Sequence, residues 1–398
     1  MRIGILTYHR SLNNGAFIQC YSLFKRIKKE HPTADVEVID YTSPNIEKLY
    51  PQNLVQFFKG IVTIKDFLIR IRRLLTDPLI LNRYRKKKTA FESCYGELKL
   101  SDKRFYNESL KELFQYIDTR YDLVVVGSDA IWNYSVRGFP NPYFLDTCIR
   151  IPKFCYAASC SGMNYELIPE VERNTIRDIL ESYYFLGVRD EDSARFLSYI
   201  GCKHSYYHTC DPTLFLNLEE MPVDETALKI KLQKYGFSFE RKTIGVMGTN
   251  KMCQLVKETM GKDYQIVSLF NYCRSADVNL YDITPFEWAY VFRFFDLTVT
   301  SFFHGTLLSL KNGVPVICIA KENKYTNKHV SKVKDLLCRV EMPDVYYHMD
   351  FLSKHKDVLR QKITLLVREY LKDRIAIQLN AELRYGDSFF DAIKDVVI

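Results

Sequence analysis

The stretch TVTSFFHGTLLSLKNGVPVI, residues 298–317, decides the fold class of this chain. Its first residues continue a β-branched run that begins at Leu297, and such a run is typical of a buried strand. A helical pattern starts near His304 and ends at Asn312-Gly313. The stretch therefore predicts one imidazole at the carboxyl end of a strand, beside the start of a helix. In an open α/β sheet ligands bind at this place, and the free N–H groups of a helix start attract phosphate or carboxylate.

His304 has two interpretations. An imidazole changes its charge near neutral pH, so beside an anion-binding helix start it could perform acid–base chemistry on an anionic substrate. A lone histidine is more often a structural core residue or a helix cap. A second stretch favours the functional interpretation: in YDLVVVGSDAIWN, residues 121–133, an apolar strand precedes the tight turn Gly127-Ser128-Asp129, which can present a carboxylate. Two such sites predict two α/β halves that face one cleft.

The composition agrees with a folded, multi-domain protein. A chain of 398 residues is long enough for roughly two to three domains of about 150 residues each, and 47% apolar residues exclude intrinsic disorder. The 11 cysteines include no C-x-x-C pair, which fits core thiols in a reducing cytosol better than a disulfide framework. No signal peptide and no window of 18 uncharged apolar residues is found. We therefore expect a cytoplasmic protein.

Predicted strands and helices alternate along most of the chain, a pattern typical of parallel sheets covered by helices. The pattern restarts after a polar stretch near residues 217–226. We therefore expect an α/β fold of two doubly wound domains, formed by residues 1–216 and residues 217–345. Residues 346–398 have a helical pattern and could pack back on the first domain.

Residues 54–90 form a basic insert in the first domain. They contain ten Lys or Arg and two Asp, so their net charge of +8 equals that of the whole chain. Apolar residues from Phe57 to Leu75 recur at helical spacing and predict a basic amphipathic helix. Such a helix could lie on an anionic membrane surface, bind polyphosphate, or face a core with a solvated basic side. Nucleic acid is not expected, because no recognised motif accompanies the short RYRKKK run.

Six motifs follow one another along the chain: ILTYHRSLNNGAFIQCYSL, YDLVVVGSDAIWN, FCYAASCSG, GVRDEDSARFL, CDPTLFL and TSFFHGTLLSLKNGVPVI. As an ordered set they resemble the polysaccharide pyruvyl transferase family, from the first strand to about residue 340. The resemblance implies a GT-B-like fold, in which two Rossmann-type domains face a catalytic cleft, with residues 1–216 as the acceptor side and residues 217–345 as the donor side. It also implies transfer of pyruvate, as a ketal, from phosphoenolpyruvate to two hydroxyls of a sugar. The basic insert departs from the family pattern and leaves the acceptor open.

This chemistry assigns roles to particular residues. His304 could be the general acid, Arg189 could bind a carboxylate or phosphate with its planar fork, and Asp129 could take a proton from a sugar hydroxyl. Two structural alternatives stay open: Asp129 could cap its own turn, and Arg189 could form a surface salt bridge with the acidic residues that follow it. The predicted substrate-binding residues are Ser301, Gly305, Thr306, Asn13, Asn14, Gly15 and Ser128.

No metal and no cofactor is expected, with phosphoenolpyruvate as a co-substrate. His204, His208 and Cys210 share a strand face, but such closely spaced groups rarely converge on a tetrahedral ion. No GxGxxG follows the first strand, which argues against a bound dinucleotide. The expected partners are phosphoenolpyruvate, a sugar or lipid-linked oligosaccharide, and an anionic surface at the inner membrane. Two alternatives remain: a GT-B glycosyltransferase that uses a nucleotide sugar, and a non-catalytic protein that binds a glycan or a lipid carrier.

Overall fold

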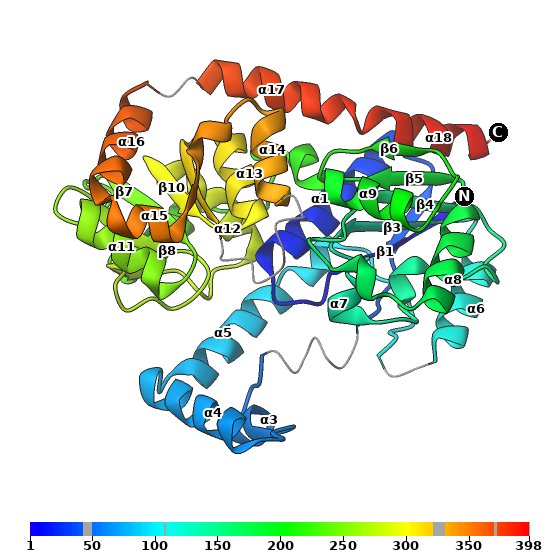
Figure 1. Cartoon of the computed structure of the whole chain (residues 1–398), viewed down its shortest axis with the longest axis horizontal. Helices are drawn as coiled ribbons and strands as arrows, with labels where there is room; N and C mark the ends of the chain where they lie inside the picture. Colours follow the sequence, from blue (N-terminus) through cyan, green and yellow to red (C-terminus); the bar gives the residue numbers. More distant parts are fainter. Residues whose placement is uncertain (43–49, 107–108, 321–330, 370–371, 398) are drawn as a thin grey trace.

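The computed structural model describes residues 1–42, 50–106, 109–320, 331–369 and 372–397. In these residues two parallel sheets form, each of six strands and each covered by helices (Figure 1). The N-terminal sheet has the order β2-β1-β3-β4-β5-β6 and contains β1 (Arg2–Leu6), β2 (Asp35–Val38), β3 (Leu123–Asp129), β4 (Lys153–Ala158), β5 (Phe185–Val188) and β6 (Tyr206–His208). The C-terminal sheet has the order β12-β11-β10-β7-β8-β9 and contains β7 (Thr243–Met247), β8 (Gln265–Ser268), β9 (Val278–Asn279), β10 (Leu297–Thr300), β11 (Val316–Ala320) and β12 (Tyr346–His348). The predicted pair of doubly wound α/β domains is confirmed.

The helices connect successive strands. Those of the N-terminal domain are α1 (Asn14–Glu30), α6 (Leu110–Arg120), α7 (Tyr134–Arg137), α8 (Glu170–Glu181) and α9 (Glu191–Tyr199). Those of the C-terminal domain are α10 (Glu225–Lys234), α11 (Asn250–Met260), α12 (Pro285–Val291), α13 (Phe303–Lys311) and α14 (Lys332–Arg339). The last four helices are α15 (Met349–Lys354), α16 (Lys356–Glu369), α17 (Lys372–Arg384) and α18 (Asp387–Val397).

Each sheet has one point where its strand order reverses. In the N-terminal sheet β2 and β3 lie on opposite sides of β1, and in the C-terminal sheet β8 and β10 lie on opposite sides of β7. Asp129 ends β3, and His304 lies at the start of the helix that follows β10. Both residues therefore lie at the carboxyl edge of a topological switch point, where open α/β sheets bind ligands.

Aromatic side chains join the two domains. The Phe286 ring in α12 packs edge-on against Phe17 and Tyr21 of α1, with ring centroids 5.5 and 4.8 Å apart. The carboxyl-terminal helices add a second connection, because α17 contacts α13 while α18 packs on β5 of the first sheet. Phe389 of α18 lies with its ring centroid 4.6 Å from that of Tyr156. Figure 1 shows α17 and α18 running across both domains.

The basic insert contains three helices, α3 (Leu54–Phe58), α4 (Ile64–Thr76) and α5 (Ile80–Glu92), where the sequence predicted one. Thr63 caps α4 by accepting a hydrogen bond from the Asp66 N–H at 3.1 Å, and α4 ends just before Pro78, which disfavours helix at the residue preceding it. Figure 1 shows α3 and α4 at the end of an arm that extends from the two sheets through α5.

The arm exposes apolar side chains. None of the α4 side chains that the structure describes is buried, and Ile64 and Leu75 are 80% and 74% exposed. One interpretation of the basic insert, a helix that faces a core with its apolar side, is therefore wrong for α4. In α5, by contrast, Ile80, Lys87 and Phe91 are buried. No helix in the described ranges is long and apolar enough to cross a membrane.

Candidate active site

One buried carboxylate joins the two domains. Asp211 follows β6, Arg189 follows β5, and His304 belongs to α13 of the other domain. Arg189 Nη1 donates to Asp211 Oδ2 at 2.5 Å, and His304 Nε2 lies 3.7 Å from the same oxygen. Arg189 is only 1% exposed, and the Asp211 side chain is equally enclosed. His304, which is predicted to be the acid, therefore lies beside a buried ion pair.

Asp129 lies on the other side of Arg189. Its Oδ1 is 3.6 Å from Arg189 Nη2 and also accepts a hydrogen bond from the Ala130 N–H at 2.8 Å. Burial by itself would raise the pKa of Asp129, but Lys332, Arg189 and His304 outweigh it and lower the pKa. Asp129 is thus an anion that both caps its own turn and pairs with Arg189. The surface salt-bridge interpretation of Arg189 is wrong, because its partners are buried.

Several polar atoms around His304 have no hydrogen-bond partner among the described residues. They are the Ser301 hydroxyl, Arg189 Nε, and two nitrogens that reach only a carboxylate at ion-pair distance, Arg189 Nη2 and His304 Nε2. Phe302, the N-cap residue of α13, provides no side-chain hydrogen bond to the first N–H groups of the helix. Buried donors without acceptors are uncommon in folded proteins. This set therefore fits a ligand that brings carboxylate or phosphate oxygens.

The loop after β1 lies against His304. Asn13 caps α1 through its side-chain oxygen, which accepts from the N–H groups of Gly15 and Ala16. A Cβ added at Gly15 would lie 2.3 Å from His304 Nδ1, so only glycine allows the imidazole to pack there. The side-chain oxygen of Asn14 is buried without a partner in the described residues. The structure thus brings the loop that contains Asn13, Asn14 and Gly15 to His304, with Gly15 in contact with the imidazole.

Two predicted contacts are wrong. The Thr306 N–H donates to the Phe302 carbonyl at 3.0 Å within the helix, and its hydroxyl lies 3.2 Å from Cys318 Sγ, so neither is available for a ligand. The Ser128 hydroxyl is fully buried and donates to Gln19 Oε1 at 2.7 Å. Gly305 stays at the helix start, where a Cβ would lie 2.5 Å from Thr300 Oγ1.

The structure adds charged residues that the sequence did not identify. Asp211 is visible in the sequence only as part of a Cys-Asp-Pro turn, and nothing in the order of residues places that turn beside His304. Lys332 follows a segment outside the described residues, and burial together with Arg189 lowers its pKa. Asp40, at the end of β2, forms a bidentate pair with Arg10 at 2.8 and 2.6 Å. Among the described residues no group of three His, Cys, Asp or Glu side chains could hold a metal ion.

Two facing Rossmann-type domains that share a cluster of buried charged residues define a protein of the GT-B type. The fold is similar to UDP-GlcNAc 2-epimerase from Neisseria meningitidis bound to UDP-GlcNAc, with a TM-score of 0.53 and 13% identity over 100% of this chain and 99% of that chain. It is also similar to the UDP-GlcNAc 2-epimerase of Methanocaldococcus jannaschii, with a TM-score of 0.54 and 10% identity over 100% of this chain and 99% of that chain. At these identities the likeness shows the fold alone.

The sequence gives the family. The model of the polysaccharide pyruvyl transferase family matches residues 13–323, a range that includes Asp129, Arg189, Asp211 and His304. The chain therefore belongs to this family, as the ordered motifs predict. No curated protein matches the chain in sequence.

Gly15 provides a test of the packing around His304. We expect Gly15→Ala to push the imidazole away, to destabilise the protein by about 1–3 kcal/mol through overpacking, and to shift the His304 signals in NMR spectra of histidine-labelled protein. Gly96→Ala is the matched control, because a Cβ there would meet nothing within 4 Å. Equal effects of the two substitutions would contradict the close approach of α1 to His304.

The buried carboxylate predicts a dependence of stability on pH. Burial would raise the pKa of Asp211, but His304 and Arg189 hold it well below its usual range. Because the folded pKa lies below the unfolded value of about 3.9, the stabilisation is complete above about pH 5 and decreases as the pH falls. We expect Asp211→Asn to lower the melting temperature at pH 7. Between pH 5 and 3, the melting temperature of this variant should fall less steeply with pH than that of the wild type. Asp102→Asn, at an exposed position, should keep the wild-type slope.

Proposed function

We propose that this protein transfers pyruvate from phosphoenolpyruvate to two hydroxyls of a sugar in a surface polysaccharide or a lipid-linked glycan. The product is a cyclic ketal, and phosphate is released. Family membership supports action on a polysaccharide. The observation that carries the proposal is the set of unpaired donors around His304, which suits a substrate with both a carboxylate and a phosphate.

The donor would be held by groups that the cleft already contains. Phosphoenolpyruvate brings two anionic groups. The Arg189 guanidinium, whose Nε has no hydrogen-bond partner among the described residues, lies 4.5 Å from the ring centroid of Phe303 at the uncapped start of α13. Lys332, whose Nζ lies 5.7 Å from the ring centroid of Phe303, adds a second cation near the same helix start, and the Ser301 hydroxyl adds a further donor. Charge-assisted hydrogen bonds in a site that excludes water are the strong class of hydrogen bond.

The reaction then follows from where a proton can be delivered. His304 donates a proton to the methylene carbon of the enol phosphate, and the adjacent carbon acquires oxocarbenium character. The first sugar hydroxyl attacks this carbon and loses its proton. The bond from carbon to the phosphate oxygen breaks, phosphate departs with the electron pair, and the second hydroxyl closes the ketal with loss of its proton. Asp211 holds the imidazole in position throughout.

Asp129 remains the candidate acceptor of a hydroxyl proton. Its lowered pKa makes it a weak base, but attack on an oxocarbenium centre needs little help from a base. Its ion pair with Arg189 also gives it a positioning role, because it fixes the guanidinium between two carboxylates.

His304 provides the direct test. We expect His304→Ala to stay folded and to lose about 10²–10⁴ in turnover, the usual contribution of a general acid. The assay combines protein, phosphoenolpyruvate and a galactoside or mannoside acceptor, and it measures released phosphate together with the mass gain of the sugar. His355→Ala, at an exposed position, is the control and should match the wild type. Turnover near the wild-type level in His304→Ala would rule out the acid role.

The alternative is a glycosyltransferase that uses a nucleotide sugar. One structural relative is bound to UDP-GlcNAc and aligns over nearly its whole length, so the fold suits such a donor as well. The same assay with UDP- or GDP-sugars in place of phosphoenolpyruvate separates the two reactions. No turnover in either assay would favour a protein that binds a glycan or a lipid carrier without catalysis.

The arm supports a peripheral position at an anionic membrane surface. Its exposed apolar residues, such as Ile64 and Leu75, alternate with exposed Lys65, Arg72 and Arg85. Each basic residue close to an anionic membrane contributes about 1 kcal/mol, and the apolar side chains of α4 could insert between the headgroups. A lipid-linked acceptor would be met at the same surface.

Vesicle binding tests this position. We expect the protein to co-sediment with phosphatidylglycerol-containing vesicles at low salt and to be released by high salt. Replacing Lys65, Arg72 and Arg85 by Gln should abolish the binding, whereas Lys251→Gln and Lys354→Gln, on the C-terminal domain and its helices, should not. Binding that is absent at low salt, or unaffected by the three substitutions, would contradict the membrane role.

A further inference from the structure

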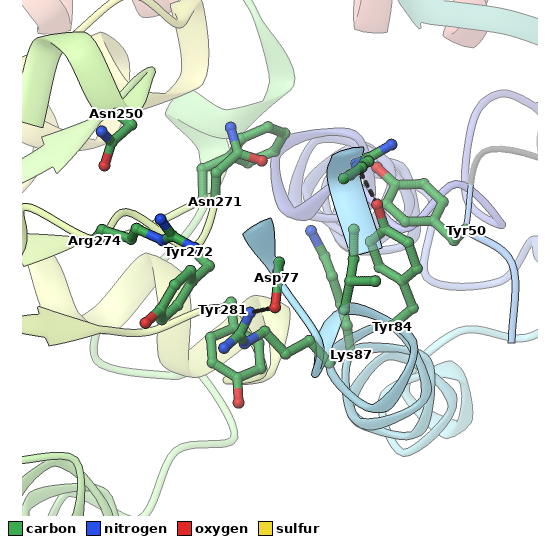
Figure 2. Close-up of a pocket in the computed structure, with 13 residues that line it drawn as sticks. Tyr50, Asp77, Tyr84, Lys87, Asn250, Asn271, Tyr272, Arg274 and Tyr281 are labelled. Atoms are coloured by element: carbon green, nitrogen blue, oxygen red, sulfur yellow. Dashed lines mark hydrogen bonds and ion pairs between the residues drawn. The ribbon is translucent and has the colours of Figure 1, made fainter. Parts of the chain in front are cut away.

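A cavity of about 770 Å³ lies between the basic insert and the C-terminal domain, within the usual range of ligand sites, about 300–1,000 Å³. Figure 2 shows Tyr50, Tyr84 and Lys87 facing Asn250, Asn271 and Arg274. The second wall consists of loops that follow β7, β8 and β9, at the same carboxyl edge as His304. The cavity lining contains the charged residues Arg73, Arg83, Lys87, Arg274 and Asp77 and the aromatic residues Tyr50, Tyr84, Phe270, Tyr272 and Tyr281.

Lys87 is the central feature of this pocket. It is only 6% exposed, and its Nζ lies over the rings of Phe270 and Tyr50 at 4.9 and 5.5 Å from their centroids. Within the described chain it forms no hydrogen bond or ion pair with an anion, and burial lowers its pKa to about 8. A buried ammonium without an anion is costly. An anionic ligand in the cavity would supply the missing partner.

The other cations are held in place by the walls. The Arg83 guanidinium stacks on Tyr272 at 3.6 Å from the ring centroid and pairs with Asp77. Arg73 donates to the hydroxyl of Tyr84. Four cationic side chains and one carboxylate line the cavity, so its lining suits an anionic ligand. The tyrosine rings and the amides of Asn250 and Asn271 are suited to a sugar, which stacks its C–H face on aromatic rings and exchanges hydrogen bonds through its hydroxyls.

The pocket lies next to the candidate active site. The Phe270 ring, which lines the pocket, lies with its centroid 4.6 Å from that of Phe302. Phe302 is the N-cap of α13, and His304 is two residues further on. The contact between the Phe270 and Phe302 rings therefore connects the pocket lining to the start of the helix that contains His304.

We infer that this pocket binds a diphosphate group that carries a sugar, with Lys87 and Arg83 on the phosphates and the tyrosine rings on the sugar. The identification of that sugar as the acceptor rests on the proposed function, whereas the binding itself does not. The same chemistry occurs in a sugar on a polyprenyl diphosphate carrier and in a nucleoside diphosphate sugar.

Calorimetry with two probes tests the pocket in the absence of phosphoenolpyruvate. The probes are UDP-N-acetylglucosamine and N-acetylglucosamine linked through diphosphate to geraniol. We expect at least one to bind, and Lys87→Met to weaken that binding about 10- to 100-fold, the ratio for one lost charge-assisted hydrogen bond. Lys88→Met is the matched control, because the ammonium of Lys88, the next residue in the helix, is half exposed and pairs with Glu92. The probe that binds more tightly identifies the source of the diphosphate.

The outcomes separate this inference from the proposed function. Lys87→Met should keep its melting temperature and its affinity for phosphoenolpyruvate. If it does not fold, Arg83→Gln on the partly exposed wall gives the same test. Absence of binding for both probes, or equal losses in Lys87→Met and Lys88→Met, would overturn the inference. If the protein does not bind phosphoenolpyruvate but binds a probe in a way that depends on Lys87, the proposed donor is overturned and the assignment of the pocket remains.

Discussion

The arrangement of the candidate active site depends on the contacts of the Asp211 carboxylate with Arg189 and His304. This carboxylate is buried, and it is shared by a guanidinium of its own domain and an imidazole of the other. A buried carboxylate is tolerated only with charged partners and hydrogen bonds, so Arg189 and the Thr213 N–H, which donates to Asp211 Oδ1 at 2.9 Å, are both required. Because His304 also packs on Gly15, a shift of one domain against the other would break the carboxylate contact and the α1 contact together.

The architecture follows from the sequence wherever local patterns suffice. The β-branched run before Ser301 forms β10, and the helix that follows contains His304, because strand and helix periodicities are local properties. The roles of Ser128 and Thr306 could not be predicted in this way. A predicted helix start does not show which N–H groups are used within the helix, and a predicted turn does not show that Gln19 fills its hydrogen bonds. Asp211 is brought to His304 only by the packing of two domains.

The basic insert shows the same limit at the level of single residues. Lys86, Lys87 and Lys88 are identical in sequence terms, but successive residues of a helix are rotated by about 100°. Lys87 is therefore buried over Phe270, whereas its two neighbours are exposed. A net charge of +8 counted along the chain thus divides into groups that line a pocket and groups that face outward. Net charge alone predicted an anionic partner but not two separate places for it.

The three features lie in an order that favours the lipid-linked form of the acceptor. The pocket is lined by the end of α4, by α5 and by the C-terminal loops, and its Phe270 ring contacts Phe302 at the start of the helix that contains His304. A diphosphate held there would direct its sugar past Phe270 and Phe302 toward the acid and its lipid toward α4. A nucleoside would make no contact with the exposed leucine and isoleucine side chains of the arm. A prenyl chain that leaves the pocket would instead continue along these side chains into a bilayer. The position of the pocket thus gives a reason for the apolar surface of α4, which the fold of the two domains does not require.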